Sequence, residues 1–68
     1  MRHVKKTTPF YSPTSDEWKR LRLEVGLTQR EMAYLVCTTE RTIQRWESGN
    51  YKIPPMAWEL IKLKLEIH

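Results

Sequence analysis

Residues 26–49 decide the fold, and they read GLTQREMAYLVCTTERTIQRWESG. Thr28, with Glu31 three residues later, forms a capping-box pattern that predicts the start of a helix over residues 28–36. The helical period then breaks, and a second helix is predicted over residues 39–48. Two short helices joined by so short a turn are typical of a helix-turn-helix.

The residue types within this stretch suit two helices that cross at a sharp angle. Ala33 is small where the second helix must pass the first, and Ile43 with Trp46 forms an apolar pair that anchors the second helix to a core. Either threonine of residues 38–39 can cap the second helix. The turn usually takes glycine because its backbone is left-handed, and Cys37 stands there instead, at a cost of about 1 kcal/mol.

A further helix is predicted before this pair. Thr14 and Glu17 repeat the capping-box pattern, and Gly26 stands where a left-handed residue ends a helix. The inward stripe of this helix is predicted to be Trp18, Leu21 and Val25. Together these segments predict an all-α, compact four-helix domain.

The fourth helix is predicted to begin at Pro55, which suits a first helical position, and to run close to the C-terminus. Its apolar residues are Met56, Ala57, Trp58, Leu60, Ile61, Leu63, Leu65 and Ile67. Because one small core cannot bury them all, we expect a twofold homodimer through this helix. The predicted interface residues are Met56, Trp58 and Leu65. The alternative is that the helix wraps its own core and leaves the surplus residues at the surface.

Length and charge divide the chain into an arm, residues 1–13, and a domain, residues 14–68. Sixty-eight residues suffice for one small core and exclude a second domain. The net charge is +4, of which residues 1–14 contribute +3 and residues 15–50 contribute zero. If the excess charge marks a nucleic-acid contact, it points to the basic, extended arm and not to the domain. The candidate arm contacts are Arg2, Lys5 and Lys6; the alternative is a solvated, disordered arm.

Several classes of protein are excluded by composition. Cys37 is the one cysteine, and with only His3 and His68 beside it neither a disulfide framework nor a usual zinc site is available. No nucleophile–base arrangement is legible, so we expect no enzyme activity, no metal and no other cofactor. The longest apolar run, residues 33–37, is far too short for a membrane span. We expect a soluble cytoplasmic protein with no membrane partner.

Three segments carry a resemblance to a known family: Leu21-Arg22, the run of residues 26–33 and the run of residues 38–49. They resemble the Cro/C1-type helix-turn-helix repressors, the XRE family, over roughly residues 16–65. The resemblance implies a lambda-repressor-like fold and operator binding by a dimer. It also implies that Arg22 pairs with Glu47, which makes Arg22 structural.

The outward face of the second motif helix is expected to read bases when Ile43 and Trp46 face inward. Arginine can donate two hydrogen bonds to guanine, glutamate can accept one from cytosine, and threonine offers a methyl group to thymine. The expected base-reading residues are Thr39, Glu40, Arg41, Gln44 and Arg45; the alternative is a solvated polar face. The expected phosphate contacts are Gln29, Asn50, Tyr51 and Lys52. The alternative for Gln29 is a polar first-turn residue with no phosphate contact.

These patterns predict a sequence-specific double-stranded DNA-binding transcriptional regulator. A dimeric repressor or autoregulator is favoured, with residues 39–48 in the major groove of its operator. The small size is similar to that of phage or mobile-element regulators, and an anti-CRISPR-associated autoregulator is one such subclass. The alternative is an antitoxin, or another protein-interaction module with the same fold, whose main partner is a protein.

Overall fold

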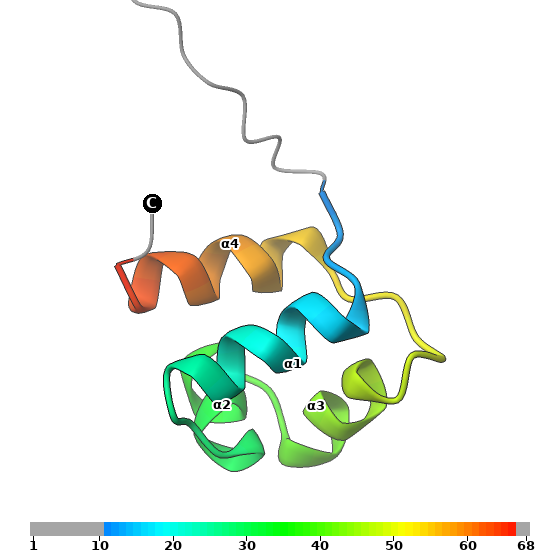
Figure 1. Cartoon of the computed structure of the whole chain (residues 1–68), viewed down its shortest axis with the longest axis horizontal. Coiled ribbons are helices and arrows are strands. Elements are labelled where there is room, and N and C mark those ends of the chain that lie inside the picture. The colour runs from blue at the N-terminus through cyan, green and yellow to red at the C-terminus, as the bar shows by residue number, and fades with distance from the viewer. Residues whose placement is uncertain (1–10, 67–68) are drawn as a thin grey trace, which may run out of the picture.

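The computed structural model describes residues 11–66, and within them the chain forms four helices and no strand. In chain order they are α1 (Ser15–Glu24), α2 (Gln29–Leu35), α3 (Glu40–Glu47) and α4 (Pro55–Lys64). In Figure 1, α2 and α3 lie next to each other below α1, and α4 runs above it. The predicted all-α four-helix architecture is confirmed.

Helices α1, α2 and α3 begin at threonines whose side chains satisfy free backbone N–H groups. Thr14 and Glu17 form a complete capping box on α1, and Thr28 and Glu31 form a second on α2, as predicted. Of the two candidate caps for α3, Thr39 is the cap, and its Oγ1 accepts from the backbone N–H of Thr42 at 3.2 Å. These local bonds place each helix start at a definite residue.

The cap of α1 is extended by a residue that precedes the helix. The hydroxyl of Tyr11 donates to Glu17 Oε1, and the backbone N–H of Thr14 donates to the same oxygen at 2.9 Å. These bonds, the Tyr11 bond first, lower the pKa of the Glu17 carboxyl below its ordinary value. The charged carboxylate of Glu17 thus accepts hydrogen bonds both from the N-cap residue and from the segment before the helix.

The core is centred on Trp18 of α1, which is completely buried. Its ring meets that of Trp46 edge to face, with centroids 5.2 Å apart, and lies 6.1 Å from the ring of Trp58. The remaining buried apolar side chains come from α2, α3, α4 and the segment before α4: Met32, Ala33, Val36, Ile43, Ile53, Ala57 and Ile61. The residues predicted to face inward from α2 and α3 are all among these.

The turn between α2 and α3 is left-handed at the residue that the sequence places there. Cys37 has φ 58°, and its side chain is exposed. Gly26, after α1, has φ 73°, as its predicted role requires. After this left-handed turn α3 packs against α2, and Ala33 of α2 is buried.

One prediction about the core is wrong, and one core residue was not predicted. Val25 does not complete the inward stripe of α1, because it is the residue that ends the helix and it is 39% exposed. Ile53, which the sequence analysis left without a role, is only 1% exposed and belongs to the core. The chain between α3 and α4 is therefore anchored to the domain by an apolar side chain.

On α4 the buried positions are Ala57 and Ile61, whereas Met56 and Leu63 are 74% and 69% exposed. Trp58 and Leu65 are half-buried against the core. The predicted arm contacts Arg2, Lys5 and Lys6 lie outside the described residues, as does Ile67.

Candidate nucleic-acid interface

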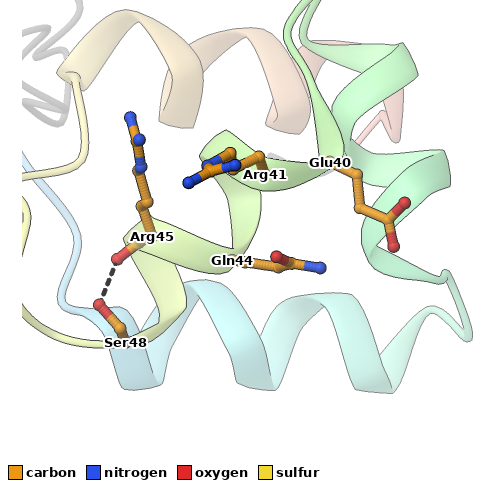
Figure 2. Close-up of a pocket in the computed structure, with 5 residues that line it drawn as sticks. All are labelled: Glu40, Arg41, Gln44, Arg45 and Ser48. Carbon is orange, nitrogen blue, oxygen red and sulfur yellow. Dashed lines mark hydrogen bonds between the residues drawn. The ribbon is translucent and has the colours of Figure 1, made fainter.

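Helix α3 presents one polar face to solvent. Ile43 and Trp46 point into the core with 0% and 8% exposure, which turns the opposite side of the helix outward. Figure 2 shows the side chains that line this open concavity: Glu40, Arg41, Gln44, Arg45 and Ser48. Four of the five predicted base-reading residues are thereby brought together on one exposed face.

The polar face has two chemically different halves. In Figure 2 the guanidinium groups of Arg41 and Arg45 extend to one side of α3, and the side chains of Glu40 and Gln44 extend to the other. Glu40 and Gln44 also line a second concavity, shared with Gln29 of α2. One half of the face therefore carries two cationic hydrogen-bond donors, Arg41 and Arg45. The other half, with Glu40 and Gln44, can both accept and donate hydrogen bonds.

The fifth predicted reader, Thr39, lies at the N-terminal end of this face. Its Oγ1 is occupied by capping, since it lies 3.0 Å from Thr42 Oγ1 besides accepting from the Thr42 backbone. The methyl group is therefore the main part of the Thr39 side chain that remains free to contact DNA. It is also the group predicted to contact thymine.

A nearly buried ion pair joins α1 to the end of α3. Arg22 Nε lies 2.7 Å from Glu47 Oε2, and Arg22 Nη2 donates to Glu47 Oε1 at 2.8 Å. Arg22 Nη1 also donates to the carbonyl of Leu27 at 3.1 Å. The hydrogen bond to Glu47 raises the pKa of Arg22 above its ordinary value. The pairing implied by the family resemblance is confirmed, and Arg22 is engaged within the protein.

Gln29, a predicted phosphate contact, is tied to the same ion pair. Its Nε2 donates to Glu47 Oε1 at 3.1 Å, and the residue is half-buried at the start of α2. Glu47 therefore orients the Gln29 amide beside the polar face of α3. The bond uses one of the two N–H groups of the amide and leaves its carbonyl oxygen available.

The other predicted phosphate contacts lie in the segment that follows α3. Asn50, Tyr51 and Lys52 are all exposed, and the buried Ile53 follows them directly. The Arg45 guanidinium carbon lies 5.7 Å from the centre of the Tyr51 ring. This contact could not be predicted from the sequence, since no local spacing rule relates a helix residue to a loop residue beyond the end of the helix.

The predicted dimer residues do not form one exposed patch. Met56 is exposed, but Trp58 and Leu65 are half-buried against the core. Met56 lines an apolar groove together with Leu63, which the prediction did not include among the interface residues. Seven residues separate these two side chains, which places them on one face of α4.

The described residues, 11–66, contain no cluster of three or more histidine, cysteine, aspartate or glutamate side chains suited to a metal ion. Over the same range, no helix has the length and apolar character needed to cross a bilayer.

The sharp α2–α3 pair, packed on α1 and α4 with one helix face left polar and exposed, defines a helix-turn-helix protein. A family model described as helix-turn-helix matches residues 19–62, which is well over half of the chain. The chain therefore belongs to the Cro/C1-type, or XRE, helix-turn-helix family of DNA-binding regulators. No curated protein matches the sequence.

Proposed function

We propose that this protein is a sequence-specific transcriptional regulator that inserts α3 into the major groove of a double-stranded DNA operator. The observation that carries the proposal is the exposed polar face of α3, with Arg41 and Arg45 on it and Ile43 and Trp46 beneath it. The major groove, about 12 Å wide, admits one helix and displays the acceptor pair of guanine that arginine recognises.

Each residue on this face is proposed to contact a different base. Arg41 and Arg45 each donate two hydrogen bonds to a guanine, and Glu40 accepts one from a cytosine. Gln44 faces an adenine or lies beside Gln29, and Thr39 packs its methyl group on a thymine. The carboxylate of Glu40 repels phosphates, so a base edge that donates a hydrogen bond is a better partner for it than the DNA backbone.

Phosphate contacts at the two ends of the motif fix the register on DNA. The proposed contacts are Gln29 at the start of α2 and residues 50–52 after α3, together with Arg2, Lys5 and Lys6 of the arm. Residues 15–50, which include the polar face, have no net charge by count, whereas residues 1–14 carry +3. We therefore expect the arm to supply much of the electrostatic attraction to the DNA phosphates. Deletion of residues 1–8 is expected to weaken binding and flatten its salt dependence.

We propose that the regulator acts as a homodimer and represses the gene that encodes it. Two copies related by a twofold axis read two half-sites of a palindrome. The exposed apolar groove of α4 that contains Met56 and Leu63 supports this assembly. The predicted interface residues Trp58 and Leu65 do not line that groove and pack against the core instead, so the proposed interface keeps Met56 and adds Leu63.

The proposed function is tested by gel shifts with the DNA upstream of the gene for this protein, over a series of salt concentrations. We expect specific binding that falls steeply as salt rises, and a footprint with twofold symmetry. Failure to bind any duplex at low salt would instead favour a protein-interaction module such as an antitoxin.

A further inference from the structure

The segment after α3 carries an aromatic residue that lies against one of the proposed base readers. Arg45 Cζ is 5.7 Å from the centre of the Tyr51 ring, within the range of a cation–π contact. Tyr51 is 54% exposed, and Arg45 is exposed as well, so neither side chain is held by the core. Each is the other's aromatic or cationic neighbour on this exposed surface.

The backbone that carries Tyr51 is held at both ends. Ser48 Oγ donates to the carbonyl of Arg45 at 2.6 Å, a bond drawn in Figure 2, and accepts from the backbone N–H of Asn50 at 3.3 Å. Gly49, with φ 87°, reverses the chain between them. On the far side, Ile53 is buried in the core. The loop is thus folded back toward Arg45.

A free arginine side chain samples many rotamers and loses that freedom when it donates two hydrogen bonds to a base edge. The face of an aromatic ring attracts a guanidinium without accepting a hydrogen bond from a particular N–H group, and a guanidinium that stacks on the ring keeps its in-plane N–H groups free. The donors stay available for guanine. Such a contact prepares Arg45 for base reading and adds no direct bond to DNA.

We propose that Tyr51 is a positioning residue for base recognition, and that the face of its ring holds the Arg45 guanidinium ready to bind a guanine. This inference rests on the proposed function, in which Arg45 reads a base. The ring and the hydroxyl of Tyr51 are proposed to have different roles. The ring acts on specificity through Arg45, whereas the hydroxyl is the group that can contact a phosphate.

The test uses the full chain and a library of randomised DNA duplexes, from which the preferred sequence is selected. The Kd is then measured on that duplex and on duplexes changed at one base pair, and their ratio is the base preference. Arg45→Ala identifies the base pair that Arg45 reads, with an expected loss of preference of about 5- to 150-fold there.

At that base pair, Tyr51→Leu is expected to lower the preference about two- to fivefold, and Tyr51→Phe to preserve it. In the Arg45→Ala background, Tyr51→Leu is expected to cause no further loss of preference. Tyr34→Leu is the matched control, because Tyr34 is 82% exposed on α2 and lines a separate apolar surface. Circular dichroism confirms that each variant is folded.

Three results overturn the inference. If Tyr51→Leu keeps the preference, or if Tyr51→Phe loses as much as Tyr51→Leu, the ring does not position Arg45. If the losses from Arg45→Ala and Tyr51→Leu simply add, the two residues act independently. The failure of the proposed function looks different: Arg45→Ala then leaves the preference unchanged at every base pair, or no sequence is selected.

Discussion

Arg22 of α1 and Glu47 of α3 are joined by two parallel hydrogen bonds of 2.7 and 2.8 Å, and their side chains are only 11% and 5% exposed. This geometry ties the end of α3 to the rest of the domain. Through Gln29, the same carboxylate also reaches the start of α2. The ion pair therefore links both helices of the motif to α1, and its two side chains line the same open concavity as Glu40 and Gln44 of the polar face.

Removal of one partner of this pair is expected to leave the other nearly buried and uncompensated. Arg22→Met should lower the free energy of unfolding by about 3 kcal/mol, a large part of the stability of so small a domain. Arg22→Lys should lower it too, because lysine cannot form the two-pronged pair. Urea unfolding measures the loss. The double variant Arg22→Met, Glu47→Leu should recover much of it, and a single-variant loss below about 0.5 kcal/mol would contradict this account.

Arg41 is expected to determine one position of the operator. Arg41→Ala should cost about 1–3 kcal/mol on the preferred duplex and relax the preference at one base pair. Arg30→Ala removes the same charge from α2, where Arg30 lines a separate surface with Tyr34, and should leave base preference intact. Binding titrations against single-base variants measure both. A loss that is equal on every sequence would make Arg41 a phosphate contact.

The exposed groove on α4 leads to a prediction about assembly. Leu63→Glu should shift the protein from dimer to monomer, since Leu63 is 69% exposed and its replacement need not disturb the core. Leu23→Glu, on α1 and 59% exposed, introduces the same charge away from the groove and should keep the dimer. Sedimentation velocity distinguishes the two states. A dimer that survives Leu63→Glu places the interface on another surface.

The turn between α2 and α3 is expected to gain stability from glycine. Cys37→Gly should raise the free energy of unfolding by about 1 kcal/mol, because φ 58° is unfavourable for a residue with a Cβ atom and the exposed thiol contributes little packing. Cys37→Ala keeps the Cβ and should not give this gain. Thermal unfolding of the two variants checks the difference, and equal stability would mean that the turn is not strained.

The capping box of α1 predicts a dependence of stability on pH. The folded pKa of Glu17 is lowered, mainly by the hydrogen bond from Tyr11, so its contribution is present above the unfolded value of about 4.3 and is lost as pH falls through the folded value. Glu17→Gln should be slightly less stable than wild type at pH 7 and equally stable in strong acid. Glu24→Gln, at the exposed far end of α1, is the control. If the difference in the free energy of unfolding between wild type and Glu17→Gln stays constant as pH falls, the charge of Glu17 does not contribute to the cap.

Local sequence rules predicted the helices well because their signals act over a few residues. Thr14, Thr28 and Pro55 mark helix starts through bonds or backbone restrictions within one turn, and Cys37 is left-handed where the turn demands it. The inward direction of Ile43 and Trp46 follows from helical spacing alone, and it is what turns Arg41 and Arg45 outward. The polar face of α3 was for this reason foreseeable.

Other features depend on which segments of the chain pack against one another. The spacing of residues along the sequence does not give that information. The sequence does not show that Ile53 enters the core, that Val25 and Leu63 stay exposed, or that Tyr51 lies over Arg45. Each depends on the paths of loops and on which side of α4 meets the core, where Ala57 and Ile61 are buried and Met56 is not. Capping residues and helical spacing were enough to predict the helices and the outward face of α3. How that face is held could not be read from spacing, because it depends on loop paths and on which side chains fill one small core.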